Sequence, residues 1–178
     1  METDAYDAAQ SIFRGTFDLA DIVFLIILLF LLLCSALASA SEVAYFSLSP
    51  GELEKLKEKG YDKVANLHQK PNLLLSTILI TNNFVNVGIV ILSTYLVNSL
   101  FDFSGNPVLG FIIQVIGVTF IILLFGEIIP KLYANRSQVK MAIFMAGPLT
   151  FLTYLFSDRS VEPSGGIGQK LALARSIF

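Results

Sequence analysis

Polar side chains whose oxygens could bind a cation are embedded in strongly apolar stretches of the chain. Asn82 and Asn86 lie in one stretch, Glu127 lies near the end of another, and Ser39 and Glu42 lie near the end of the first. An ionisable or strongly polar side chain at the depth of a bilayer costs about 2.5 to 3.5 kcal/mol on insertion scales. Such side chains must meet one another or face a watery cavity, which makes them a candidate cation site.

The spacing of these residues on helices would let them converge. Asn82 and Asn86 are four residues apart and share a helix face, as do Ser39 and Glu42 at a spacing of three. At about 1.5 Å per residue, Ser39 lies about 25 Å and Glu127 about 28 Å from the outer ends of their helices. Both residues are expected in the inner half of the membrane, at depths that overlap those of the asparagines.

The sequence Gly-Glu-Ile-Ile-Pro at 126–130 adds a backbone oxygen. Pro130 has no N–H, so an α-helix would leave the carbonyl of Gly126, four residues earlier, without its hydrogen-bond partner. An unpaired carbonyl in hydrocarbon is tolerated only where it lines a cavity or binds a ligand. The resulting all-oxygen set suits hard cations, whereas zinc and copper prefer imidazole or thiolate. Its members are Ser39, Asn82, Asn86, Gly126 and Glu127.

Each of these residues also has a structural interpretation, which the sequence leaves open. Asparagines and serines in membrane helices often form interhelical hydrogen bonds, at about 0.6 kcal/mol each. Glu127 could pair with Lys131, one turn away on the same face, and Glu42 could contact the adjoining loop. The small residues Ser35, Ala36, Ser39 and Ala40 are typical of a helix-packing face.

Composition places the chain among integral membrane proteins. Hydrophobic residues make up 54% and charged residues 15% of the 178 residues, against about a quarter charged residues in soluble domains. The mean hydropathy is +0.71. No stretch of the sequence carries the dense basic charge expected of a nucleic-acid binder, and no nucleophile with a paired base indicates an enzyme.

The apolar stretches predict an all-α membrane protein with three transmembrane helices. Residues 1–21 are expected to form an acidic extracytoplasmic segment, and residues 22–156 a transmembrane domain with spans from 22, at about 73–97 and at about 108–129. Residues 51–70 predict a cytoplasmic helical hairpin, whose interleaved lysines and glutamates favour solvated helices over a lipid-headgroup site. Lysines and arginines follow the first and third spans but not the second, which places the N-terminus outside.

Residues 141–156 could cross the membrane or lie along its inner leaflet. This apolar stretch is shorter than the roughly 20 residues of a span, and Gly147 and Pro148 interrupt it. If it crossed, the basic residues of the tail would lie outside, against the positive-inside rule. We therefore expect a kinked juxtamembrane belt helix and a cytoplasmic C-terminus, with a fourth span as the alternative.

The chain carries three motifs in order, SASEVAYFSLSPGELEKL, TNNFVN and FGEIIPKLYANR. Together they resemble the transmembrane domain of unknown function 21, which is shared by bacterial hemolysin-C-like magnesium and cobalt efflux proteins and by animal cyclin M transporters. The resemblance covers about residues 22–156 and implies that they form a transporter-type domain. It implies a homodimer in the bacterial inner membrane and magnesium ligands at Ser39, Asn82, Asn86 and Glu127. It also implies export of Mg²⁺ as the transported ion, with Na⁺ as the coupling ion.

The domain content and the tail are expected to depart from that family. Full-length relatives carry cytoplasmic ATP-binding domains of the cystathionine-synthase type, which we expect to be missing from this chain. Residues 157–178 no longer resemble the family, which is typical of a fragment or an altered reading frame. The N-terminal part is similar to gliding-motility-associated members from Bacteroidetes. The alternative function is therefore a non-transporting membrane accessory or scaffold protein.

Overall fold

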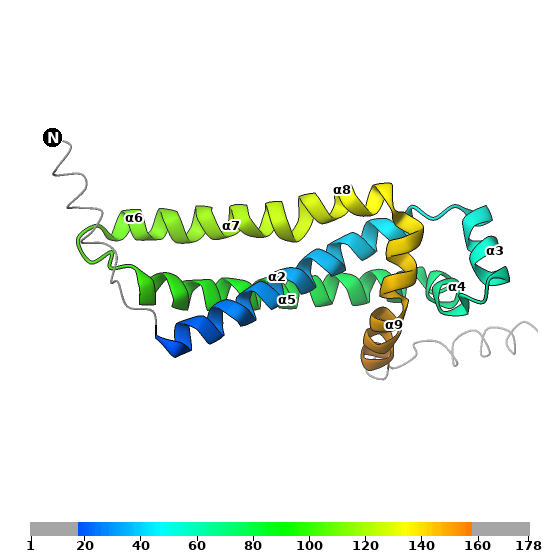
Figure 1. Cartoon of the computed structure of the whole chain (residues 1–178), viewed down its shortest axis with the longest axis horizontal. Helices are drawn as coiled ribbons and strands as arrows, with labels where there is room; N and C mark the ends of the chain where they lie inside the picture. The colour runs from blue at the N-terminus through cyan, green and yellow to red at the C-terminus, as the bar shows by residue number, and fades with distance from the viewer. Residues whose placement is uncertain (1–17, 158–178) are drawn as a thin grey trace, which may run out of the picture.

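The computed structural model describes residues 18–157, whose regular elements are helices. In chain order they are α2 (Leu19–Phe46), α3 (Pro50–Glu58), α4 (Asp62–His68), α5 (Pro71–Leu100), α6 (Pro107–Ile112), η1 (Ile113–Gly117), α7 (Val118–Ile121), η2 (Ile122–Ile128), α8 (Ile129–Arg136) and α9 (Gln138–Ser157). Three long segments, α2, α5 and the run from α6 to α8, extend along the long axis, with α3 and α4 at one end (Figure 1). Most of the expected N-terminal segment and of the expected tail lies outside the described residues.

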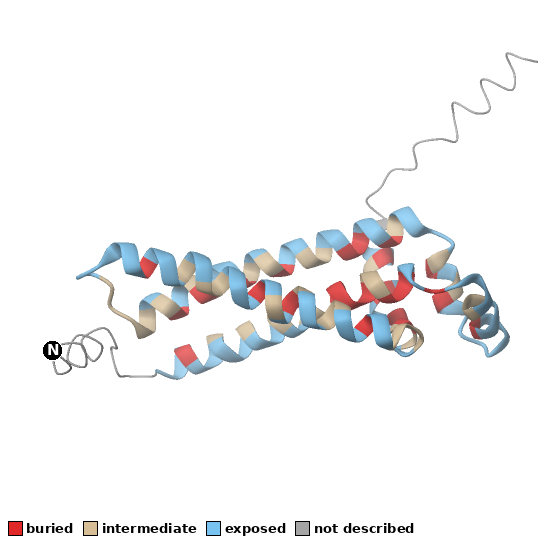
Figure 2. Ribbon diagram, turned by 90° about the horizontal axis from the view of Figure 1, so that it is seen from above, coloured by how far each residue is buried: buried red, intermediate tan, exposed pale blue. Residues whose placement is uncertain are grey.

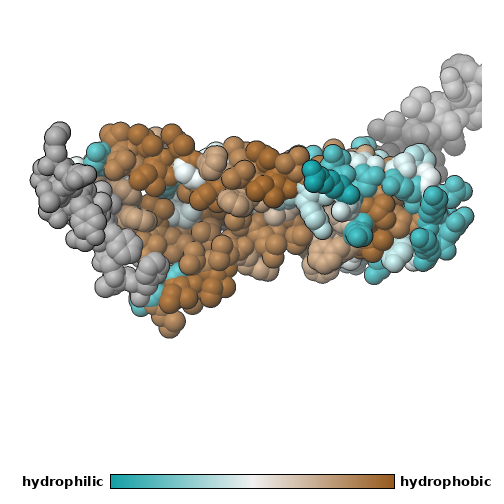
Figure 3. All heavy atoms as spheres, turned by 45° about the horizontal axis from the view of Figure 1, so that its top comes forward, coloured by the Kyte–Doolittle hydropathy of each residue, from teal (hydrophilic) through white to brown (hydrophobic). Residues whose placement is uncertain are grey.

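The described helices have the surface of a membrane protein. Within residues 18–157, four helices are long and apolar enough to cross a membrane: Leu19–Phe46, Pro71–Leu100, Pro107–Arg136 and Gln138–Phe156. Figure 3 shows apolar side chains covering the long helices, while hydrophilic side chains gather at the end that carries α3 and α4. A surface so extensively apolar is expected only where lipid or another protein covers it. The all-α membrane class predicted from composition is confirmed.

The predicted helical hairpin is present as α3 and α4. Ser49 and Glu52 form a capping box at the start of α3, in which the Ser49 N–H donates to Glu52 Oε2 at 2.8 Å. These hydrogen bonds from Ser49 hold the pKa of Glu52 below its ordinary value, because they favour the carboxylate. Gln138 Nε2 also donates to Glu52 Oε1 at 3.2 Å, which ties the hairpin to the start of α9.

The largest buried cluster lies where α9 meets α2. It contains alanines of α2, α8 and α9, which allow these helices to approach closely, and larger side chains of α4 and α5. Figure 2 shows buried positions concentrated toward this end of the molecule. Tyr45 of α2 is fully buried in the cluster, and its hydroxyl donates to the Ala142 carbonyl of α9 at 3.0 Å. This bond fixes α9 against α2.

We expect Tyr45→Phe to lower the free energy of unfolding by about 1 kcal/mol, because it removes one buried hydrogen bond and little volume. Thermal unfolding of the purified chain in detergent measures the effect. Tyr95→Phe is the matched control, because the Tyr95 ring is 45% exposed and packs edge-on against Phe24. Equal stabilities of the two variants would contradict the anchoring role of Tyr45.

The expected limits of the last helix are wrong. The last helix begins at Gln138, directly after the non-helical Ser137, and spans 20 residues with Pro148 inside it. The limits 141–156 were too narrow because hydropathy gives no weight to the polar residues at the start of the helix. The length argument against a fourth span therefore fails. In Figure 1, however, α9 runs across the ends of the long helices and not alongside them.

The first and third long helices also extend beyond their expected limits. α2 begins at Leu19 because Asp18 and Asp21 form a capping box there. The Asp21 carboxylate is 2% exposed and accepts a 2.7 Å hydrogen bond from Ser99 of α5, so this acid is part of the helix bundle. The third helix continues past Pro130 to Arg136, and two stretches of π-helix, η1 and η2, occur within it.

Candidate cation site

Asn82 and Asn86 of α5 direct their side-chain oxygens toward Ser35 of α2. The Ser35 hydroxyl lies 3.0 Å from Asn82 Oδ1 and 2.7 Å from Asn86 Oδ1. Ser35 is fully buried between the helices. A serine hydroxyl has one proton to donate, so one proton serves two acceptor oxygens in this cluster. The cluster therefore has a surplus of acceptors, which a bound cation would satisfy.

Gly126 of η2 brings the third long helix against the same serine. A Cβ at position 126 would lie 3.0 Å from Ser35 Oγ, closer than ordinary van der Waals contact. Glycine therefore permits an approach that another residue would obstruct. The structure thus brings together Asn82, Asn86 and Gly126, three of the predicted ligand residues, around a serine that the sequence analysis assigned to helix packing.

Ser39 lies one helical turn beyond Ser35 on the same face of α2. It is 1% exposed, and its hydroxyl has no hydrogen-bond partner among the described residues. The Thr81 hydroxyl of α5 is also buried and has no hydrogen-bond partner among the described residues. A buried polar group without a partner costs about 1 to 3 kcal/mol and is rare in native proteins. The unpaired Ser39 hydroxyl is what a ligand-binding role for Ser39 would require.

Glu127 follows Gly126 and is half-buried. Its carboxylate has no hydrogen-bond or ion-pair partner among the described residues. Lys131 instead pairs with Glu42 of α2, with 3.1 Å between Lys131 Nζ and Glu42 Oε2. The alternative pairing of Glu127 with Lys131 is therefore wrong, and Glu42 has a structural contact with α8. Glu127 is left free to balance the charge of a cation.

The π-helix changes which backbone carbonyl faces the missing N–H of Pro130. The Ile129 N–H donates to the Leu124 carbonyl, five residues earlier. In that register the nitrogen of Pro130 faces the Phe125 carbonyl, whereas in the α register it faces Gly126. The prediction for Gly126 assumed an α-helix throughout. In the π register the carbonyl that faces Pro130 is that of Phe125, and the helix returns to the α register at Ile129. π turns are rare and are frequent at functional sites.

Ser35 and Thr81 are the polar residues of this region that sequence reasoning missed. Ser35 had a usable signal, since it precedes Ser39 by four residues and therefore shares its face. Among the described residues, no group of three or more His, Cys, Asp or Glu side chains could hold a metal ion. A cation here would depend on neutral oxygens and on the single carboxylate of Glu127.

The helices and this cluster define an all-α membrane protein with a candidate cation site between its three long helices. The chain belongs to the cyclin M transmembrane N-terminal domain family, whose model matches residues 26–159. The resemblance predicted from the three motifs is thereby confirmed at the level of the family.

Relatives come from bacteria and animals. The UPF0053 protein of Haemophilus influenzae is 36% identical over 134 residues, which are 74% of this chain and 31% of that protein. The UPF0053 inner membrane protein YfjD of Escherichia coli is 31% identical over 66% of this chain and 28% of its own length. The metal transporter cnnm-4 of Caenorhabditis elegans is 31% identical over 63% of this chain and 25% of its own length.

The chain therefore spans between 25% and 31% of the length of these relatives. Membrane localisation agrees with the inner membrane relative and with the candidate spans. These matches give no support to the gliding-motility group from Bacteroidetes that the N-terminal part resembled.

Proposed function

We propose that this chain transports a divalent metal cation, magnesium, across the membrane. The observation that carries the proposal is the convergence of Asn82 Oδ1 and Asn86 Oδ1 on one buried hydroxyl, beside Gly126, whose neighbour in the chain is Glu127. Membership of the cyclin M family and the nematode relatives named metal transporters support the same function. Export coupled to sodium stays a prediction from the family resemblance.

The chemistry of the donors favours a hard cation. The proposed ligands are the Ser39 hydroxyl, the two asparagine oxygens, the Glu127 carboxylate and one backbone carbonyl before Pro130, that of Gly126 as the sequence predicts or that of Phe125 in the π register. Together they supply five or six oxygens. Magnesium requires about six oxygens and loses its water reluctantly, so a preformed set lowers the cost of dehydration. A single carboxylate among neutral oxygens keeps binding weak enough for release, since ligand charge is a main determinant of affinity. Ser35 has a positioning role through its contacts with both asparagines.

The experiment is a magnesium titration of thermal stability in the purified chain. Wild type should be stabilised by Mg²⁺, and Ser39→Ala should bind it about tenfold more weakly, the equivalent of about 1.4 kcal/mol. Stability without metal should hold or rise in this variant, because an unpaired buried hydroxyl is removed. Ser41→Ala is the control, since Ser41 is equally buried but donates to the Leu37 carbonyl at 2.6 Å. The same loss of affinity in both variants would contradict a ligand role for Ser39.

One observation favours a second function, that of a non-transporting accessory or scaffold protein. The Ser35 hydroxyl already contacts both asparagines, as expected of interhelical hydrogen bonds. If one carboxamide turned over, its NH₂ group would donate to Ser35 and the surplus of acceptors would disappear. The two functions differ in what the asparagines do, which mutagenesis distinguishes.

We further propose that the N-terminus lies outside, that α9 is a belt on the cytoplasmic face, and that the chain forms a homodimer. The course of α9 across the long helices supports the belt (Figure 1). The exposed apolar side chains of the long helices leave ample surface for lipid and for a second copy. Regulation by ATP-binding domains, which full-length relatives are expected to carry, is a prediction for those relatives.

We expect a cysteine replacing Ser157, in a Cys34→Ala background, to react with a membrane-impermeant thiol reagent from the same side as a cysteine replacing Lys57. Ser157 ends α9 and Lys57 lies in α3, so both face the cytoplasm if α9 does not cross. A cysteine replacing Ser104, in the loop between α5 and α6, marks the opposite side. Labelling of position 157 together with position 104 would establish a fourth span.

A further inference from the structure

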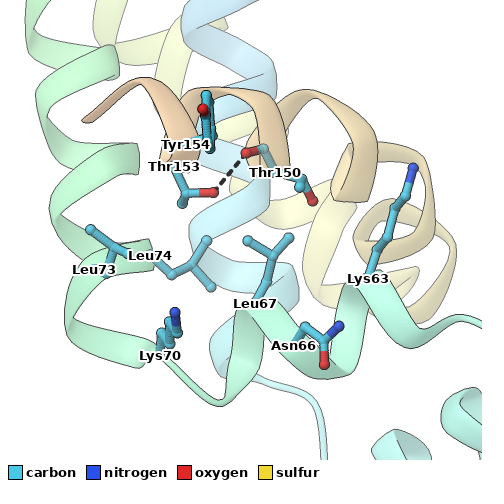
Figure 4. Close-up of a pocket in the computed structure, with 9 residues that line it drawn as sticks. All are labelled: Lys63, Asn66, Leu67, Lys70, Leu73, Leu74, Thr150, Thr153 and Tyr154. Carbon is cyan, nitrogen blue, oxygen red and sulfur yellow. Dashed lines mark hydrogen bonds between the residues drawn. The ribbon is translucent and has the colours of Figure 1, made fainter. Parts of the chain in front are cut away.

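A pocket lies away from the candidate cation site, between α4, the start of α5 and the C-terminal half of α9 (Figure 4). It encloses about 270 Å³. One part of its lining is polar and includes Lys63, Asn66 and Lys70, whereas another part is apolar and includes Leu73, Leu74 and Tyr154. A pocket with both kinds of wall suits an amphiphilic ligand with a charged group at one end.

The charge of the polar wall is positive. In Figure 4, Lys63 and Lys70 lie on opposite sides of the pocket, with Asn66 between them. No residue of the lining is acidic, and neither lysine forms an ion pair with another described residue. The two ammonium groups and the Asn66 amide are therefore available to an anion. The N-terminus of α5, whose first turn contains no acidic residue, adds a weaker positive field.

The position of the pocket matches the border between lipid and water. Figure 3 shows the surface changing from apolar to hydrophilic toward the end of the molecule that carries α4. α5 begins at Pro71 and continues as a candidate membrane span, so Leu73 and Leu74 start its apolar part. Basic pockets at this border bind the phosphate of anionic lipid headgroups. An inorganic phosphate would leave the leucine wall without a partner.

We propose that this pocket binds an anionic phospholipid, with its phosphate at the polar wall formed by Lys63, Asn66 and Lys70 and its glycerol and acyl carbons against the leucines. The interleaved charges of residues 51–70 favoured solvated helices over such a site. The fold changes that conclusion, because α9 supplies the second wall. Thr150, Thr153 and Tyr154 of α9 line the pocket opposite α4. A bound lipid would therefore link the hairpin to α9.

The test compares lipids and anions added to the purified chain in neutral detergent. Phosphatidylglycerol should raise the melting temperature, whereas phosphatidylcholine and inorganic phosphate at equal concentration should have little effect. Lys63→Gln/Lys70→Gln should weaken phosphatidylglycerol binding about thirtyfold, since each lysine near a membrane contributes about fivefold. Both lysines are exposed, so the variant should fold normally.

Two controls separate the pocket from general attraction to negative charge. Lys57→Gln/Lys59→Gln removes the same charge from exposed positions at the end of α3, outside the pocket, and should bind phosphatidylglycerol like wild type. Lys63→Arg/Lys70→Arg keeps the charge and should retain binding. Equal losses in the two glutamine variants would overturn the proposal. Stabilisation by inorganic phosphate equal to that by the lipid would overturn the lipid as ligand. Neither outcome depends on whether the chain transports magnesium.

Discussion

Glu127→Gln is expected to abolish stabilisation by magnesium while leaving the helices assembled. Glutamine keeps the size of the side chain and one oxygen but removes the negative charge that would balance the cation. Because the Glu127 carboxylate has no partner among the described residues, the substitution breaks no contact. Stability without metal should therefore change by less than about 1 kcal/mol. Thermal unfolding with and without Mg²⁺ measures both quantities.

Glu42→Gln is the matched control for this prediction. It removes the same charge from α2 and breaks the ion pair between Glu42 and Lys131. The two side chains of this pair are 41% (Glu42) and 38% (Lys131) exposed. A pair with that exposure contributes about 0 to 1 kcal/mol, so stability should fall slightly and the response to magnesium should remain. A normal magnesium response of Glu127→Gln, or its loss in both variants, would reject Glu127 as the charge of the site.

Helix positions were predictable because hydropathy and proline chemistry are local. Pro50, Pro71 and Pro107 each stand at the start of a helix in the structure, where a missing N–H costs nothing. The helical hairpin followed in the same way from short amphipathic stretches. The expected helix limits were wrong where polar residues extend a helix, as at Asp18 and Gln138. Capping and packing contribute stability there that hydropathy does not measure.

Contacts between helices were less predictable because they depend on rotation and register. The alternative pairing of Glu127 with Lys131 assumed an uninterrupted α-helix, but η2 shifts the register just before Pro130. Each π turn rotates the following residues relative to an α-helix, which changes the faces that they share. The convergence of Asn82 and Asn86 was predictable from their spacing. The spacing of Ser35 from Ser39 placed it on the same helix face, but its contact with both asparagines was not predictable, because that contact depends on how α2 lies against α5.

Replacement of Asn82 and Asn86 together by leucine separates a transporter from a scaffold. If the asparagines are ion ligands, Asn82→Leu/Asn86→Leu should lose magnesium flux while the fold persists, because leucine suits an apolar bundle and each lost hydrogen bond contributes about 0.6 kcal/mol. Ser35, left without partners, could donate to a carbonyl four residues earlier, as Ser41 does. If the asparagines only join helices, the same variant should lose structure, and magnesium should affect neither protein.

Ser35→Ala sharpens the distinction because it breaks the same interhelical contacts and leaves both Oδ1 atoms in place. A scaffold should be weakened as much by Ser35→Ala as by the double leucine variant. A transporter should keep most of its flux in Ser35→Ala and lose it in the double variant, since only the latter removes ligands. Magnesium release from liposomes that contain the purified chain measures flux, and the detergent-stable assembly measures structure. If the double leucine variant folds well and shows the flux of wild type, the asparagines are not ion ligands. An inactive wild type would favour the accessory role.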